Sequence, residues 1–206
     1  GKSPKILVIG DLMIDHYLWG SSNRISPEAP VPIVNIKSES SLLGGAGNVI
    51  NNLNSLGAKI DIISIIGDCK NSQKLEKLLK NINISTNFLI KQSNRIASKK
   101  SRVIVAKQQV ARYDIENTEE ISSESEYAIL ENFKKIIGKY EILLLSDYGK
   151  GVLTNTLTKS LISIANKNDT KVLVDPKGFN YSKYKGAYLL TPNKKEASEA
   201  TSIDIK

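Results

Sequence analysis

Residues 5–15 read KILVIGDLMID, an apolar run that leads into aspartates at positions 11 and 15. A short continuous apolar run of this kind is typical of a strand that is buried on both faces. We therefore expect Lys5–Gly10 to be a central strand of a sheet. In open α/β sheets, ligands bind outside the carboxyl ends of the strands. Asp11 and Asp15 follow this strand directly, and they are the first candidates for a functional site.

Downstream of this strand, apolar strands alternate with amphipathic helices. Gly57 and Gly138 each follow a helical stripe and predict helix ends, while Ser123 and Glu126 have the spacing of a capping box and predict a helix start. This alternation predicts a mostly parallel sheet that is covered on both faces. The expected strands are Ile60–Ile66, Asn87–Ile90, Glu141–Leu145, Lys171–Val174 and Ala187–Leu190, and the expected helices span Val49–Leu56, Leu75–Leu79, Ala128–Ile137, Thr154–Asn168 (with Leu157, Leu161 and Ile164 inward) and Asn193–Ala200.

Residues 97–114 differ from the rest because polar and β-branched side chains are mixed in the segment SRVIVAKQQVARYD. This composition predicts two exposed antiparallel strands rather than a core helix. We interpret the segment as part of a lid. His16, the only histidine, is expected at the surface or in the lid, and Cys69, the only cysteine, is expected to have no catalytic role.

The composition predicts one globular domain, residues 1–206, in the cytoplasm. The net charge is +8, but the basic residues are scattered and aromatic residues make up 6% of the chain, so we do not expect nucleic-acid binding. An anionic small molecule is a simpler partner for the excess charge. The apolar runs are too short to span a membrane, and the start of the chain has no secretory pattern.

Polar residues follow four of the expected strands, and together they outline one rim of the sheet. A Gly-rich run, GGAGN at residues 44–48, precedes a helix and allows backbone N–H groups to approach a ligand. Each polar residue has an alternative explanation as a helix cap or turn residue, and the glycines could form a tight turn. The rim residues are Asp11, Asp15, Asp147, Asp175, Lys177 and Asn193.

Two of these motifs, IGDLMID at residues 9–15 and GGAGN at residues 44–48, resemble the N-terminal signature of the ribokinase-like carbohydrate kinases. Within that family, other segments resemble the kinases that act on D-glycero-heptose 7-phosphate. The similarity extends almost from end to end. These segments are SNRISPEAPVPIV (22–34), KQQVARYDIE (107–116), LSDYGKGVL (145–153), VDPKG (174–178) and LLTPNKKE (189–196).

The resemblance implies an α/β, ribokinase-like three-layer sandwich with a mostly parallel central sheet and a small β lid. The lid segments are expected at about residues 17–37 and 97–114, and lid strands pair between subunits in related kinases, which implies a homodimer. The implied reaction uses ATP and Mg²⁺ to phosphorylate D-glycero-D-manno-heptose 7-phosphate at its C1 hydroxyl. The product, heptose 1,7-bisphosphate, leads to ADP-heptose and the lipopolysaccharide core.

The resemblance also implies roles for individual residues. Asp15, Gly44, Gly45 and Asn48 are expected in the sugar site, together with Asp147. ATP is expected at Asn193, Lys194, Lys195 and Glu196, with Glu196 reaching Mg²⁺ through water and no direct protein ligand to the metal. A substrate that carries a phosphate needs fixed positive charge. Lys177 is the first choice for that role, with Arg102 and Arg112 as the other candidates.

The family's catalytic aspartate and anion hole lie in a C-terminal Gly-Ala-Gly-Asp motif, which does not occur in these 206 residues. The resemblance therefore implies that the catalytic base lies beyond Lys206, and no catalytic residue is expected within the chain. The C-terminal part of the fold is expected to be absent as well, and the chain alone should be nearly inactive. One alternative is a non-catalytic module for sugar-phosphate binding or dimerisation. Another is a nucleoside or fructose kinase of the same fold, which would need no cations for a substrate phosphate.

Overall fold

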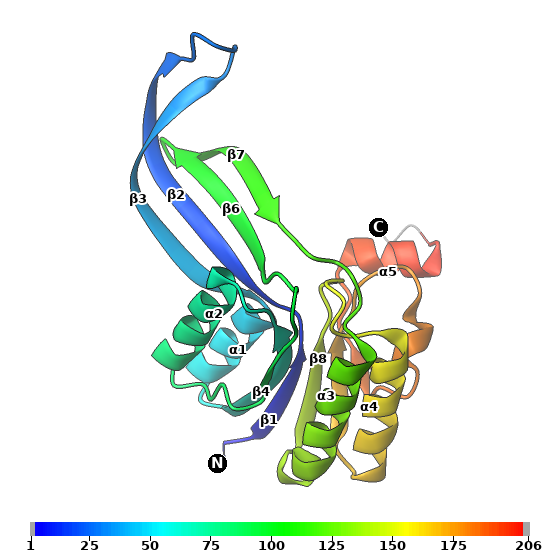
Figure 1. Cartoon of the computed structure of the whole chain (residues 1–206). Coiled ribbons are helices and arrows are strands. Elements are labelled where there is room, and N and C mark those ends of the chain that lie inside the picture. The colour runs from blue at the N-terminus through cyan, green and yellow to red at the C-terminus, as the bar shows by residue number, and fades with distance from the viewer. Residues whose placement is uncertain (1–2, 204–206) are drawn as a thin grey trace.

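A computed structural model describes residues 3–203, and its main element is a six-stranded parallel sheet (Figure 1). The strand order is β10-β9-β8-β1-β4-β5, so β1 (Lys5–Gly10) lies inside the sheet, as its apolar sequence predicts. Ile6 of β1 pairs with Ile142 on one side and Ile60 on the other. The other strands are β4 (Lys59–Ile66), β5 (Leu89–Lys91), β8 (Ile142–Ser146), β9 (Lys171–Asp175) and β10 (Leu189–Leu190).

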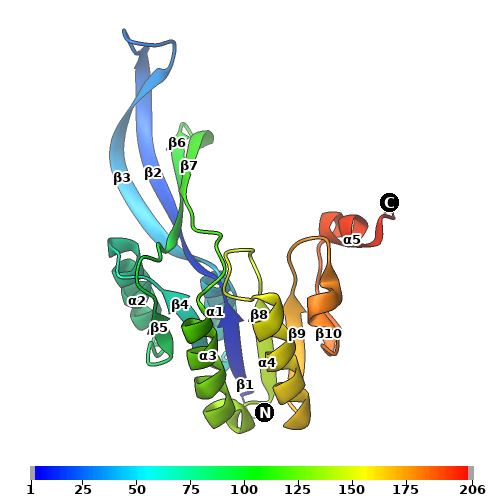
Figure 2. The same ribbon diagram turned by 45° about the vertical axis from the view of Figure 1, so that its right-hand side comes forward.

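Helices cover both faces of this sheet and complete three layers (Figure 2). Side chains alternate across a strand, so Ile6 and Val8 of β1 pack with α1 and α2, whereas Leu7 and Ile9 pack with α3 and α4. Among residues 3–203, none of the helices is both long and apolar enough to cross a membrane. The helices are α1 (Ala46–Ser55), α2 (Lys70–Asn81), α3 (Ser123–Ile136), α4 (Asn155–Lys167) and α5 (Lys194–Thr201), with short 3-10 helices at Ile137–Lys139 and Tyr181–Tyr184.

A second sheet of four strands projects from the first, and we refer to it below as the lid (Figure 1). Its order is β3-β2-β6-β7, and the antiparallel pair β6 (Ser98–Val105) and β7 (Gln108–Ile115) confirms the expected strands of residues 97–114. The other half is a long hairpin of β2 (Leu12–Ile25) and β3 (Pro32–Gly45). This hairpin starts one residue after Asp11 and ends at the Gly-rich run, so the lid is continuous with the candidate site.

Several local predictions need correction. The N-cap of α3 is Ser122, whose Oγ accepts a hydrogen bond from Ser125 N at 3.2 Å, and not Ser123. The carboxylate of Glu126 is not part of a capping box, because it accepts a hydrogen bond from the Thr154 hydroxyl of α4. Ile164 of α4 is only partly buried, and the inward positions beside Leu161 belong to Ile162 and Ala165.

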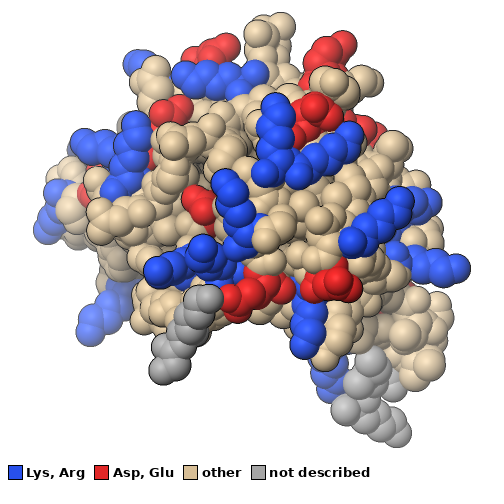
Figure 3. Space-filling view, turned by 90° about the horizontal axis from the view of Figure 1, so that it is seen from below, with Lys and Arg blue, Asp and Glu red and all other residues tan. Residues whose placement is uncertain are grey.

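The end of the molecule opposite the lid bears mixed charge. Lys and Arg side chains are spread over this surface, with acidic side chains between some of them (Figure 3). The positive charge of the chain is therefore distributed here and does not form one continuous patch.

Candidate active site

Asp11 is a structural residue rather than a free ligand at the rim. Its side chain is almost fully buried, and its carboxylate accepts backbone hydrogen bonds from Tyr148 N, Lys150 N and Val152 N at 2.8, 3.1 and 3.1 Å. Burial raises the pKa of this carboxyl, although the three backbone donors act in the opposite direction. Asp11 therefore shapes the loop after β8, and both of its carboxylate oxygens accept backbone hydrogen bonds from that loop.

Asp147 is also engaged within the protein. Its Oδ1 accepts a hydrogen bond from Gly149 N at 2.8 Å, and its Oδ2 accepts from Lys183 Nζ at 2.6 Å and from the Tyr184 hydroxyl at 2.7 Å. The residue is 4% exposed. Two of these donors come from the 3-10 helix Tyr181–Tyr184, far along the sequence, and a role of Asp147 in substrate binding stays a prediction.

The first cluster of candidate residues lies at the base of the lid. Asp15 on β2 and Arg102 on β6 form an ion pair, with Arg102 Nη1 2.6 Å from Asp15 Oδ1, and the guanidinium lies over the Tyr17 ring at 5.4 Å from its centroid. A Cβ on Gly44 would come within 2.5 Å of Asp15 Oδ2. Glycine is therefore required at position 44 if the Asp15 carboxylate is to keep this place.

A pocket of about 320 Å³ opens between this cluster and the helices α1 and α2. It brings together Asp15 and Asn48, two of the residues expected to bind sugar. Gly45 has a φ of 58° at the start of α1, and Ala46 N donates to Asp11 O at 3.0 Å, which fixes the helix start beside the pocket. The pocket is lined by Asp15, Tyr17, Leu42, Leu43, Asn48, Asn51, Leu78, Asn81 and Ile82.

Arg112 of β7 is the cross-strand partner of Arg102, so two of the three expected cations are neighbours in the lid. Arg112 itself forms a two-point contact with Asp114, through Nε at 3.0 Å and Nη2 at 2.7 Å. The hydrogen bonds and charge of Asp114 raise the pKa of Arg112. This arrangement leaves a pair of guanidinium groups beside Asp15.

The second cluster surrounds the start of α5. Asn193 is the N-cap, and a capping box joins it to Glu196: Glu196 N donates to Asn193 Oδ1 at 2.9 Å, and Asn193 N donates to Glu196 Oε2 at 3.0 Å. Lys177 Nζ donates to Glu196 Oε1 at 3.0 Å. Burial acts to raise the pKa of Glu196, but the hydrogen bonds from Asn193 and Lys177 outweigh it and lower the pKa. Lys194 and Lys195 are exposed in the first turn.

Lys177 lies apart from the other two expected cations. It pairs with Glu196, lines a separate pocket of about 390 Å³ that includes Asn155 and Phe179, and does not join Arg102 and Arg112. The hydrogen bond to Glu196 raises the pKa of Lys177. Lys177 follows β9 of the main sheet, whereas the two arginines belong to the lid, and the role of these three cations toward a phosphate stays a prediction.

His16 lies in the lid but is buried rather than exposed. Its Nδ1 is 3.2 Å from Ser101 Oγ and its Nε2 is 3.0 Å from Glu39 Oε2. Serine, histidine and glutamate in contact resemble a hydrolase triad, but Ser101 is 0% exposed and cannot reach a substrate. The contact ties β2 to β3 and β6.

The expectation about the catalytic base concerns the end of the chain. It places the base beyond Lys206, and Lys206 itself lies outside residues 3–203, the part of the chain that the structure describes. The expectation that the chain holds no catalytic base is therefore not tested by the structure and stays a prediction.

Sequence reasoning missed three residues that organise the site: Arg95, Lys183 and Tyr184. Each is a buried or partly buried side chain whose partners lie on loops distant in sequence. Arg95 lies in a short loop before β6, and Tyr184 lies in a 3-10 helix. In such segments the spacing of apolar residues follows neither the period of an α-helix nor that of a strand. The only available signal was the presence of an isolated arginine and several tyrosines between predicted elements.

The structure combines a parallel sheet with a four-stranded lid, and it places an acidic residue and a Gly-rich helix start where the two meet. These features define a ribokinase-like carbohydrate-kinase fold. Residues 3–206 match the family model described as pfkB family carbohydrate kinase. The chain therefore belongs to the pfkB family of carbohydrate kinases.

Among curated relatives, the chain is 64% identical over 205 residues to the bifunctional protein HldE of Aliarcobacter butzleri, and 58% identical over 204 residues to that of Sulfurimonas denitrificans. The two matches cover 100% and 99% of this chain, but the chain spans only 43% of the length of each relative.

Solved structures give the same fold at low sequence identity. Escherichia coli phosphofructokinase-2, in its tetrameric inhibited form, matches 98% of this chain and 66% of its own with a TM-score of 0.72 and 19% identity. Arabidopsis thaliana ribokinase complexed with ribose and ATP matches 98% of this chain and 64% of its own, with a TM-score of 0.68 and 16% identity. About a third of each of these chains has no counterpart in this sequence.

Proposed function

We propose that this chain is the sugar-binding part of a kinase that phosphorylates D-glycero-D-manno-heptose 7-phosphate at its C1 hydroxyl with ATP, forming the 1,7-bisphosphate for ADP-heptose and lipopolysaccharide core synthesis. The observation that carries the proposal is the Asp15–Arg102 pair beside Asn48 at the lid base. The Asp15 carboxylate would accept hydrogen bonds from sugar hydroxyl groups, and the Arg102 guanidinium next to it is suited to bind a phosphate. The high identity to two proteins named HldE supports the same assignment.

On the sugar side, Asp15 and Asn48 would hold hydroxyl groups, and Gly44 and Gly45 would form the wall of the site at the end of β3. The substrate phosphate would bind Arg102 and Arg112, whose planar guanidinium groups match phosphate oxygens in two-point contacts. Both arginines belong to the lid, so phosphate binding and lid closure would be coupled. Closure would exclude water, which otherwise competes with the sugar for the γ-phosphate.

On the nucleotide side, the start of α5 would face the phosphates of Mg²⁺-bound ATP, with Lys177, Lys194 and Lys195 as the nearby cations. Both oxygens of Glu196 already accept hydrogen bonds from the protein. Each carboxylate oxygen keeps a further lone pair, and this fits a contact to Mg²⁺ through water better than direct ligation. The ion would accompany ATP as part of the second substrate and neutralise charge on its phosphates.

The Gly-Ala-Gly-Asp motif does not occur in the sequence. The base and the anion-binding backbone donors of the reaction would therefore come from outside these residues, and we propose that this chain binds the sugar phosphate without turnover. Lid side chains such as Ile25, Val31, Ile36 and Val110 are exposed apolar groups. They support a homodimer formed through the lid, as a part of the same proposal, in a cytoplasmic enzyme.

A second candidate function is a non-catalytic sugar-phosphate-binding or dimerisation module. The completeness of the sugar-side cluster favours it, because Asp15, Arg102 and Asn48 are all present without the catalytic motif. The two candidates differ only in whether a continuation of the chain restores phosphoryl transfer.

Calorimetric titration of this chain with heptose 7-phosphate and with unphosphorylated heptose tests the sugar site. Arg102→Gln removes a charge-assisted contact of about 1.5–3 kcal/mol, so affinity for the phosphorylated sugar should fall about 10- to 150-fold. Affinity for the unphosphorylated sugar should change much less. Arg112→Gln, which leaves the Asp15–Arg102 pair intact, should show the same selectivity.

Lys177→Gln is the matched control, since it removes a cation that pairs with Glu196 outside the sugar pocket. It should leave heptose 7-phosphate binding unchanged. Equal affinity of the unaltered chain for both sugars, or a larger loss with Lys177→Gln than with Arg102→Gln, would contradict the assignment.

A further inference from the structure

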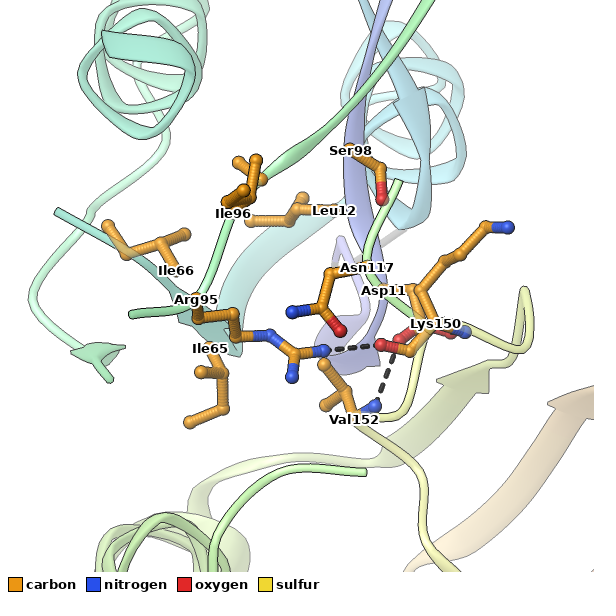
Figure 4. A pocket seen from close by; sticks show the side chains of 11 residues that line it. Asp11, Leu12, Ile65, Ile66, Arg95, Ile96, Ser98, Asn117, Lys150 and Val152 are labelled. Carbon is orange, nitrogen blue, oxygen red and sulfur yellow. Dashed lines mark hydrogen bonds between the residues drawn. The ribbon is translucent and has the colours of Figure 1, made fainter. Parts of the chain in front are cut away.

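Three of the four segments that connect the lid to the main sheet and its helices meet in one small space, whereas the fourth, from β3 into α1, does not line it. The three are Asp11–Leu12 between β1 and β2, Arg95–Ser98 at the entry to β6, and the exit from β7 at Asn117. The loop after β8 joins them through Lys150 and Val152 (Figure 4). The space they enclose holds about 10 Å³, close to the room one water molecule needs. We call this region the lid root.

Arg95 is the side chain that joins these segments. It is 7% exposed, and its guanidinium donates from Nη1 to Glu119 O at 3.1 Å and from Nη2 to Lys150 O. One planar group thus binds the chain leaving β7 and the loop after β8 at the same time. Burial lowers the pKa of Arg95, and the charges of Asp11 and Glu119 oppose this effect.

Asp11 holds the same loop from the other side. The backbone N–H of Lys150 donates to Asp11 Oδ2 at 3.1 Å. The Lys150 carbonyl accepts a hydrogen bond from the Arg95 guanidinium (Figure 4). A buried anion and a buried cation therefore act on one residue of the loop. Each offsets part of the cost of burying the other, because their charges are opposite.

The backbone at the lid root is packed without spare room. A Cβ on Gly67, directly after β4, would lie 1.6 Å from Arg95 O, and a Cβ on Gly151 would lie 1.9 Å from Glu119 O. Gly151 also has a φ of 85°. These glycines let the chain segments cross in direct contact, so a shift of one segment must displace the others.

We infer that Arg95 is a positioning residue that sets the angle of the lid relative to the main sheet and couples it to the loop after β8. Asp15 lies on β2 four residues after Asp11, and Arg102 lies on β6 seven residues after Arg95. Movement at the root would therefore displace both members of the ion pair that forms the sugar site. This consequence for binding rests on the proposed function, whereas the mechanical role does not.

Arg95→Lys tests the inference on the chain itself. A lysine keeps the charge, but its single ammonium cannot reproduce the fork that spans two carbonyl groups. Two spin labels, at Glu28→Cys in the lid and Lys135→Cys on α3 in a Cys69→Ser background, report the lid position by electron–electron double resonance. Hydrogen exchange of residues 117–121 and 147–152 reports the root. The matched control is Arg24→Lys, an exposed lid position away from the root.

With Arg95→Lys we expect a broader or shifted distance distribution and about tenfold faster exchange at the root, while exchange in β4 and α4 stays unchanged. Arg24→Lys should alter neither readout. An unchanged distance distribution in a folded Arg95→Lys protein would overturn the inference. If Arg95→Lys does not fold, Asp11→Asn, which keeps the side-chain size and weakens the hold on Lys150 N–H, must give the same local changes or the inference fails.

Both measurements are made without ligand, so they do not depend on the sugar-kinase proposal. Heptose 7-phosphate is added in a second step. If the spin-label distance distribution of Arg95→Lys is broadened and heptose 7-phosphate does not narrow it, the proposed function is refuted and the positioning role stays intact. If the distance distribution of Arg95→Lys is unchanged and heptose 7-phosphate binds as it does to the unaltered chain, the positioning role alone is refuted.

Discussion

Removal of one hydroxyl group tests how the end of β8 is held. Tyr184 is 2% exposed; its hydroxyl donates to Asp147 Oδ2 at 2.7 Å and accepts from Lys177 N at 3.1 Å. Burial, and next the charge of Asp147, raise the pKa of this phenol, so it remains a neutral donor at ordinary pH. Tyr184→Phe would leave Lys177 N–H without this acceptor and weaken the support of a buried carboxylate.

A hydrogen bond to a charged group contributes about 1.5–3 kcal/mol, and we expect Tyr184→Phe to lower the free energy of unfolding by about 2 kcal/mol. For a domain of this size, that corresponds to a fall in Tm of about 4–8 °C. Thermal unfolding followed by circular dichroism measures the difference. The same variant should weaken the Lys177–Glu196 pair, because Lys177 loses its backbone anchor.

Tyr181→Phe is the matched control. The Tyr181 ring packs edge-on against Tyr184 at a centroid distance of 5.7 Å, yet its buried hydroxyl has no hydrogen-bond partner among residues 3–203. Its removal should leave Tm unchanged or raise it. The reasoning is refuted if Tyr184→Phe has a Tm within about 1 °C of the unaltered protein, or if Tyr181→Phe is as destabilising.

Other substitutions distinguish folding from binding. Gly10→Ala should prevent folding, since its Cβ would lie 2.1 Å from a backbone carbonyl of β8; a soluble protein with normal circular dichroism would contradict this. Gly44→Ala should fold but displace the Asp15 carboxylate and weaken binding of sugar by calorimetry, and unchanged affinity would count against the site. Burial, and next the charge of Glu196, raise the pKa of Asp175, so its stabilising contribution is present at low pH and is lost as pH rises through the folded-state pKa. Asp175→Asn should therefore raise Tm at about pH 7 but not at about pH 3, and an equal gain at both would exclude this explanation.

The main sheet could be predicted from sequence because its strands are apolar on both faces and its helices carry regular stripes. Lys5–Gly10 occupies the central position that its sequence indicates. The β2–β3 hairpin is less visible, because many of its side chains are polar or exposed and do not alternate. Its length follows from pairing within the lid, which no local pattern specifies.

Sequence reasoning could not separate aspartates that bind backbone from aspartates available to a ligand. Asp11 and Asp147 both follow buried strands, as a ligand-binding residue would, but the Tyr148 N–H that Asp11 binds is 137 residues away. Which groups a carboxylate meets depends on how the intervening loop folds back. That information is tertiary and is not contained in the spacing of residues along one strand.

The arginine pair shows a different limit. The turn at Ala106 and Lys107, both with positive φ, would place Arg102 opposite Ala111 in a regular hairpin. An irregularity between Val103 and Ile104 shifts the register, so Arg112 lies opposite Arg102 instead. A single extra residue in a strand thus creates the candidate phosphate site, and sequence patterns do not predict such bulges.

The most direct test of the account is phosphoryl transfer from ATP to D-glycero-D-manno-heptose 7-phosphate. This chain is compared with the same chain continued beyond Lys206 by the segment that follows the matching region in the Aliarcobacter butzleri relative. We predict that the continued chain forms the 1,7-bisphosphate, and that the 206-residue chain binds the sugar phosphate without turnover. A continued chain that is inert with heptose 7-phosphate but phosphorylates an unphosphorylated sugar or a nucleoside would contradict the proposed substrate, and only the fold and family would remain.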